Sequence, residues 1–168
     1  DINAKTLYLD LIGEEHLPTP VVKGIKSYKL SISVPMIYLG LDAAPDLDGH
    51  HSVIAASPED VNRFYYEQVL PGRLNDENFG LICWPTHTDK SLAPRGKHVL
   101  NLIPQGFYHL EGTDWDSEKP RFIERTINNL SKSAIRGLKD HVVMAECATP
   151  LDFERQLLLP EGAIYCLQ

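Results

Sequence analysis

A chain of 168 residues has the length of one domain and is long enough to bury a sizeable apolar core. Its hydrophobic fraction of 43% and charged fraction of 23% are typical of a globular protein, and no apolar run approaches the roughly 18 residues of a membrane span. The net charge of −7 comes without a basic cluster, so we expect no nucleic-acid partner.

The cysteines predict a reducing environment. Cys83, Cys147 and Cys166 are odd in number and far apart, and each lies in an apolar run. This pattern is typical of buried free thiols rather than of a disulfide framework, and no CxxC pair indicates a zinc or iron–sulfur site. We therefore expect a cytoplasmic protein.

Both ends of the chain are unusual. Residue 1 is Asp within an apolar periodic stretch, and the chain stops at Gln168 in the middle of an apolar run with no turn signal. We expect the chain to be a piece of a longer protein.

The expected elements alternate without a βαβ rhythm. A helix over 2–12 stops at Gly13, and a second helix follows, with Thr19 as its N-cap and Pro20 at its first position. Further helices are expected after Ser57-Pro58, over 118–130 and after Thr149-Pro150, with Ser57 and Thr149 as N-caps. The expected strands are 30–42, 51–56, 79–85, 98–105 and 140–148, and 162–168 is expected to be a sixth strand or an extended segment.

The turn signal Asp48-Gly49 predicts that 30–42 pairs with 51–56 in an antiparallel hairpin. The fold class expected from this order of elements is α+β, with a largely antiparallel sheet of about five or six strands and helices packed on one face.

Several of these strands are apolar on both faces, although an antiparallel sheet usually exposes one face to water. Either helices cover both faces, or a missing domain or an apolar ligand covers the second. If one face is exposed, the residues expected on it are Met36, Tyr38, Trp84, Leu100 and Leu102.

Motifs for chemistry are weak. His50 and His51 are adjacent, and adjacent residues of a strand point to opposite faces, so we expect no shared metal. The run with Asp114, Asp116 and Glu118 has calcium-loop spacing but lacks the required later residues, so a helix N-terminus explains it better. His87 and Asp89 are more simply loop hydrogen-bonding groups. No catalytic motif is found, which leaves the catalytic residues unknown.

Four segments carry a resemblance that periodicity does not reveal. They are "LIGEEHLP", "SISVPMIYLGL", "TDKSLAPRGKHVLNLIPQ" and "GLKDHVVMAECATPLDFERQLLLPEGAIY". Together they resemble the phytoene dehydrogenase family, the FAD-dependent carotenoid desaturases and isomerases, with retinol saturase as a wider relative.

The resemblance implies that residues 1–168 are the substrate-binding domain of an FAD-dependent oxidoreductase of carotenoid biosynthesis, which performs desaturation or isomerisation. The glycine-rich FAD segments of that family have no counterpart here, so FAD is expected in the parent protein and not in this chain, which alone should be inactive.

The resemblance further implies that the exposed apolar face lies over the flavin of the parent and lines its substrate channel. The expected substrate-binding residues are then Met36, Tyr38, Trp84, Leu100 and Leu102. The implied partners are a hydrophobic isoprenoid substrate and the missing FAD domain of the same chain. Peripheral membrane contact of the parent and self-association of the fragment are further expectations. The alternative is a non-catalytic module that binds a lipid or a protein.

Overall fold

The computed structural model describes residues 2–54, 57–74, 80–104 and 106–165. The strands are β1 (Met36–Leu41), β2 (His51–Ile54), β3 (Gly80–Cys83), β4 (His98–Pro104) and β5 (Val142–Ala148). The α-helices are α1 (Thr19–Ser27), α2 (Pro58–Phe64), α3 (Pro85–Thr88), α4 (Trp115–Ser133), α5 (Leu138–His141) and α6 (Pro150–Leu157). The π-helical segments are η1 (Thr6–Gly13) and η3 (Tyr65–Val69), and the 3₁₀ turns are η2 (Glu14–His16), η4 (Lys90–Leu92) and η5 (Pro160–Gly162).

The five strands form one sheet in the order β2-β3-β4-β1-β5, and every pairing is antiparallel. The predicted α+β class with an antiparallel sheet is therefore confirmed. The predicted hairpin between 30–42 and 51–56 is wrong, because β1 pairs with β4 and β5, while β2 pairs with β3. The turn signal Asp48-Gly49 does precede β2, but the chain crosses two strand positions before it re-enters the sheet.

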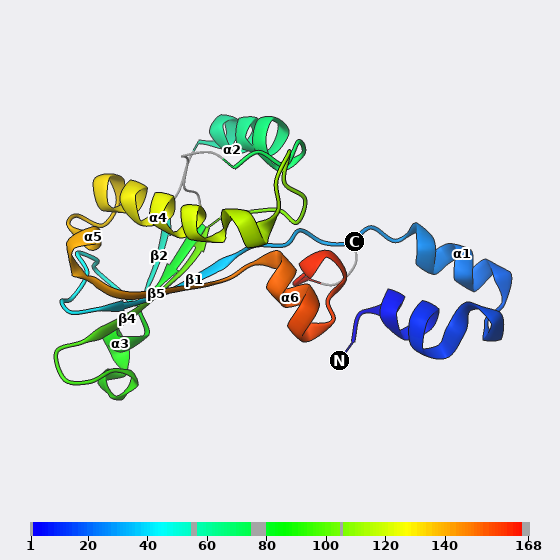
Figure 1. Ribbon diagram of the computed structural model, residues 1–168, viewed down its shortest axis with the longest axis horizontal. Helices are drawn as coiled ribbons and strands as arrows, with labels where there is room; N and C mark the ends of the chain where they lie inside the picture. The colour runs from blue at the N-terminus through cyan, green and yellow to red at the C-terminus, as the bar shows by residue number, and fades with distance from the viewer. Residues whose placement is uncertain (1, 55–56, 75–79, 105, 166–168) are drawn as a thin grey trace.

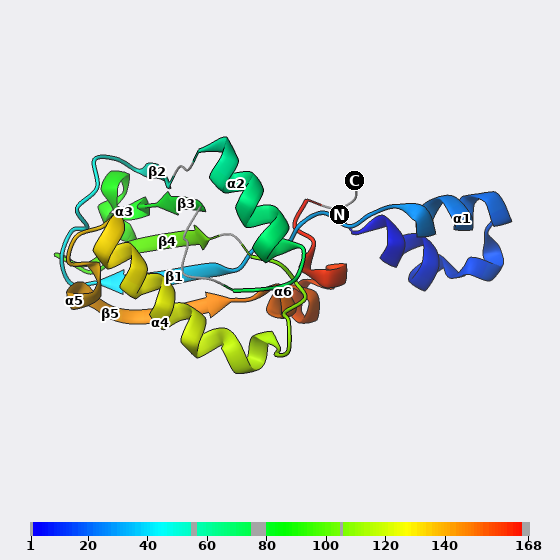
Figure 2. The same cartoon turned by 90° about the horizontal axis from the view of Figure 1, so that it is seen from above.

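Helices α2 and α4 lie over the same face of the sheet, as the view from above shows (Figure 2). Helix α4 begins after Asp114, whose carboxylate accepts a hydrogen bond of 2.8 Å from the backbone N–H of Ser117. The acidic run at 114–118 is thus a helix N-terminus, as expected. Carboxylates near the N-terminal end of a helix also complement its dipole.

The core lies between the sheet and α4. Ile37 and Leu39 of β1 are paired with Leu102 and Leu100 of β4, and all four side chains are buried. Trp115, Phe122 and Leu130 of α4 belong to the same apolar cluster. Strand alternation places one apolar set against the helix, so the other set faces away from it.

Two of the predicted N-caps are confirmed. The Ser57 hydroxyl accepts a hydrogen bond of 3.1 Å from the N–H of Asp60, and Pro58 occupies the first position of α2. Thr149 forms a capping box with Asp152, in which each side chain accepts from the other residue's backbone N–H. The predicted cap at Thr19 is wrong, because Thr19 lies inside α1 and Pro18 precedes the helix.

The N-terminal helical segments η1, η2 and α1 project away from the sheet beyond α6 (Figures 1 and 2). The turn η1 ends at Gly13, whose φ of 92° lies in a region that residues with a Cβ rarely adopt. None of the residues in these three segments is buried.

The segment 162–168, predicted as a sixth strand or an extended segment, forms no strand in its described part. Ala163 has an extended backbone and 164–165 form a turn, while 166–168 lie outside the described residues. Within the described ranges, no helix combines the length and the apolar character needed to cross a membrane.

Candidate functional site

The sheet face opposite α2 and α4, called the outer face below, is largely uncovered and carries an apolar row beside a group of polar residues. The polar residues that strand register places on this face are Asn101, Glu146, His51 and Cys83. Strand register places one row of side chains across β2, β3 and β4, formed by Val53, Leu81 and Ile103. Met36 of β1 and Met144 of β5 continue this surface toward the far edge of the sheet. In Figure 1 only α3 and the turn that follows it lie below the sheet, at one end.

Solvent exposure confirms that this surface is open in the described structure. Val53 is 67% exposed, Leu81 is 46% exposed and Met144 is 57% exposed. Tyr38 is half-buried, and its hydroxyl lies 3.5 Å from the sulfur of Met36. Exposed apolar side chains gathered on one sheet face favour the binding of a ligand or of another protein surface there.

The five predicted substrate-binding residues do not form one surface. Met36 and Tyr38 lie on the outer face, while Leu100 and Leu102 face α4 and are buried in the core. Trp84 is also buried, and its Nε1 donates a hydrogen bond of 3.0 Å to the Thr86 hydroxyl. The expectation that all five are exposed together is therefore wrong.

The reason is strand register. Leu100 and Leu102 are the cross-strand partners of Leu39 and Ile37, so all four share the inner face. Met36 and Tyr38 alternate with Ile37 and Leu39 and therefore point outward. Sequence reasoning missed Val53, Leu81 and Met144, although their apolar alternation with core positions was a usable signal.

A pocket lies beside the sheet rather than on its outer face. A pocket of about 250 Å³ is lined by residues of 31–33, 69–72 and 106–111 together with Glu161. It is built from irregular segments, so the sequence pattern carried no signal for it. Gly106 permits the close approach of these segments, since a Cβ there would lie 2.3 Å from Cδ of Pro35.

Tyr108 is a titratable residue of this pocket whose pKa is shifted. Its hydroxyl donates a short hydrogen bond to Glu154 on α6. This bond, with burial and the negative charge of Glu154 as further causes, raises the pKa of Tyr108 to about 12. Tyr108 therefore stays protonated near neutral pH and acts as a hydrogen-bond donor.

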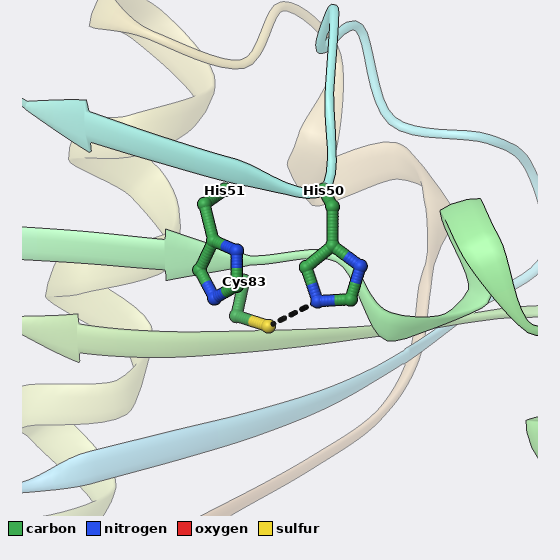
Figure 3. A group of neighbouring side chains, drawn as sticks. All are labelled: His50, His51 and Cys83. Atoms are coloured by element: carbon green, nitrogen blue, oxygen red, sulfur yellow. Dashed lines mark hydrogen bonds between the residues drawn. The ribbon is translucent and has the colours of Figure 1, made fainter.

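His50, His51 and Cys83 form a third group of interest (Figure 3). The argument that His50 and His51 point to opposite faces is wrong, because their ring centroids are 4.4 Å apart. His50 lies just before β2, so the alternation of a strand does not apply to it.

The other polar residues and cysteines singled out in the sequence make ordinary local contacts. The carboxylate of Asp89 accepts hydrogen bonds from the N–H and the hydroxyl of Ser91. The ring of His87 is tilted against that of Trp84, with 4.8 Å between the ring centroids. Cys147 is a buried free thiol and Cys83 is a half-buried one, while Cys166 lies outside the described residues.

The chain is similar to several curated proteins over nearly its whole length. It is 27% identical to a lycopene-forming phytoene desaturase of Paracoccus over 96% of the chain, and 29% identical to the rat pyridine nucleotide-disulfide oxidoreductase domain-containing protein 2 over 94% of it. It is 26% identical to the chloroplastic prolycopene isomerase of carrot over 90% of the chain.

These matches cover 32%, 30% and 24% of the three relatives, so the chain spans about a third of their length or less. No family model matches the chain. The similarity to desaturases and an isomerase along almost the entire chain nevertheless confirms the resemblance to the phytoene dehydrogenase family of carotenoid desaturases and isomerases.

Proposed function

We propose that residues 1–168 form the substrate-binding part of an FAD-dependent oxidoreductase that desaturates or isomerises a carotenoid or a related isoprenoid lipid. The observation that carries this proposal is the uncovered apolar outer face of the sheet, in a chain similar to carotenoid desaturases. The relatives named above supply the class of substrate, and the face supplies a surface that suits it.

A long polyene has almost no polar group through which a protein could orient it. Its binding surface must therefore be long, apolar and built from aliphatic, sulfur-containing and aromatic side chains. Val53, Leu81 and Ile103 form such a row across β2, β3 and β4. Met36 and Tyr38 extend the apolar surface onto the neighbouring strand β1. Their role is to bind the chain of the substrate and to exclude water from it.

The described residues do not form a cradle for a dinucleotide. Such a cradle needs a parallel strand–turn–helix unit with a glycine-rich turn, whereas every strand pairing described here is antiparallel. We therefore assign FAD to another part of a longer protein. When bound there, the flavin would supply the redox chemistry of the reaction.

This proposal predicts that a carotenoid binds to the outer face. Lycopene carried by a cyclodextrin is mixed with the purified protein, and the pigment that elutes with the protein in gel filtration is measured by its absorbance. The variant Leu81→Lys places a charge in the centre of the face, where burying it under a polyene would be costly. We expect it to lower lycopene binding by at least about tenfold.

The matched control is Leu157→Lys on α6, which changes a 60% exposed leucine away from the outer face. It should bind lycopene as the unaltered protein does. Equal binding by both variants, or no binding by the unaltered protein, contradicts the proposal and favours a module whose outer face contacts another protein.

A further inference from the structure

We propose that His50, His51 and Cys83 form a binding site for a zinc ion, with one coordination position left open. Each residue offers one ligand atom, and the three atoms lie within 4.8 Å of one another. Figure 3 shows the two rings and the thiol gathered at the start of β2 and the end of β3.

The fold brings these residues together from distant parts of the sequence. His51 and Cys83 are cross-strand partners in the β2–β3 pair, so their side chains share the outer face. The backbone of His50 is fixed by the N–H of Trp84, which donates a hydrogen bond of 2.6 Å to its carbonyl oxygen. The positions of all three ligands thus depend on paired backbone rather than on a free loop.

The tautomer of His50 is set by its surroundings. The hydroxyl of Thr88 donates its only hydrogen to the carbonyl oxygen of Pro85, at 3.2 Å. The hydroxyl oxygen of Thr88 lies 2.8 Å from Nδ1 of His50, and it accepts a hydrogen bond from that nitrogen because its own hydrogen is already donated. Nε2 of His50 is then the unprotonated nitrogen, and it lies 3.3 Å from Sγ of Cys83.

This arrangement has the features of a metal ligand and its support. Histidine ligands in metal sites usually donate their second N–H to a protein oxygen, which orients the ring and raises its basicity. Around a tetrahedral zinc ion, bond lengths of about 2.0 Å to nitrogen and about 2.3 Å to sulfur place these two ligand atoms about 3.5 Å apart. The separation of 3.3 Å between Nε2 and Sγ requires only a small adjustment.

The types of ligand favour zinc over the hard cations. Two imidazoles and a thiolate suit zinc, whereas calcium and magnesium prefer oxygen ligands. Three protein ligands leave a fourth position for water or another molecule. Asn101, the neighbour of Cys83 across the β3–β4 pair, has a buried side-chain oxygen that lacks a hydrogen-bond partner within the described ranges. A molecule bound at the open position would lie on the side of the sheet where this acceptor is available.

The proposal is tested by metal titration of the purified, untagged protein after removal of metals with a chelator. Cobalt(II) serves as the probe, because a cobalt–thiolate bond gives a charge-transfer absorption, and zinc is then added to displace it. We expect one equivalent of cobalt to bind with a thiolate band and a tetrahedral spectrum, and one equivalent of zinc to abolish both.

Variants assign the ligands. Cys83→Ser should remove the thiolate band, and His50→Ala should weaken zinc binding at least tenfold. Thr88→Val removes the acceptor for Nδ1 and should weaken binding by about 10- to 100-fold while cobalt keeps its thiolate band. Cys147→Ser and His109→Ala are matched controls away from the site and should bind as the unaltered protein does.

Circular dichroism of each variant establishes that it is folded before it is titrated. The proposal is overturned if the folded protein gives no thiolate band with cobalt. It is also overturned if Cys83→Ser retains that band, or if the loss follows Cys147→Ser instead. A simple hydrogen bond between the thiol and the imidazole would give the first of these results.

Discussion

Replacing Leu100 with alanine tests whether this residue is part of the core or of a binding surface. Its side chain is 0% exposed and packs with Leu39 beneath α4. Buried Leu→Ala changes cost about 2–5 kcal/mol, because transfer energy is lost and a cavity remains. In a domain of this size, 1 kcal/mol lowers Tm by about 2–4 °C, so we expect a fall of roughly 4–20 °C.

Leu81→Ala is the matched comparison, since it changes the same residue type on the opposite face of the same sheet. Full burial of a leucine contributes about 1.5–3 kcal/mol to stability. Because Leu81 is 46% exposed, Leu81→Ala should lower the free energy of unfolding by about half of this, or about 1 kcal/mol. Urea unfolding followed by far-UV circular dichroism gives both free energies, with equal m-values as the check on a common unfolding transition. If Leu100→Ala lowers the free energy of unfolding by no more than Leu81→Ala does, the division of the sheet into an inner and an outer face is refuted.

Three further predictions concern the edge strand β5 and the helix α6 that follows it. Thr149→Ala should lower the free energy of unfolding by about 1 kcal/mol in the same urea assay, because α6 loses its capping box. Burial alone would raise the pKa of Asp152, but hydrogen bonds from Thr149 and Lys119 outweigh it and lower the pKa. The stabilisation from Asp152 should therefore be present above its unfolded-state pKa and be lost as the pH falls through the folded-state value, and Asp152→Asn should flatten that acid limb in pH-dependent unfolding. Burial raises the pKa of Cys147 to about 12, so mass spectrometry should find it unmodified by a thiolate-selective reagent until the protein is unfolded; rapid modification in the native state would contradict this.

The sequence predicts the strands and helices well because their signals are local. The alternation in 36–41 and 98–104 and the caps at Ser57 and Thr149 each depend on a few neighbouring residues. Pairing is not local, since the two neighbours of β1 come from much later in the chain. The turn before β2 therefore predicted a hairpin that the sheet does not form.

The candidate surface could be predicted only in part. Both faces of β1 and β4 are apolar, so alternation divides the residues into two sets without telling which set the helices cover. Register and the position of α4 decide this, and they place Met36 and Tyr38 outside and Leu100 and Leu102 inside.

The polar groups were harder to predict. The pocket beside Tyr108 is assembled from irregular segments, whose positions have no periodic signal. The closeness of His50 to Cys83 arises because His50 precedes the strand and is held by Trp84. Spacing in the sequence could not show either arrangement.

Photoaffinity labelling with an isoprenoid that carries a diazirine tests the central claim most directly. After irradiation of the complex with the purified protein, peptide mass spectrometry locates the labelled residues. The account predicts labels on outer-face positions such as Val53, Leu81 and Met144, and loss of these labels when excess lycopene is present. Labels concentrated on α2 and α4 or on the pocket beside Tyr108, or labels that lycopene does not reduce, would contradict it.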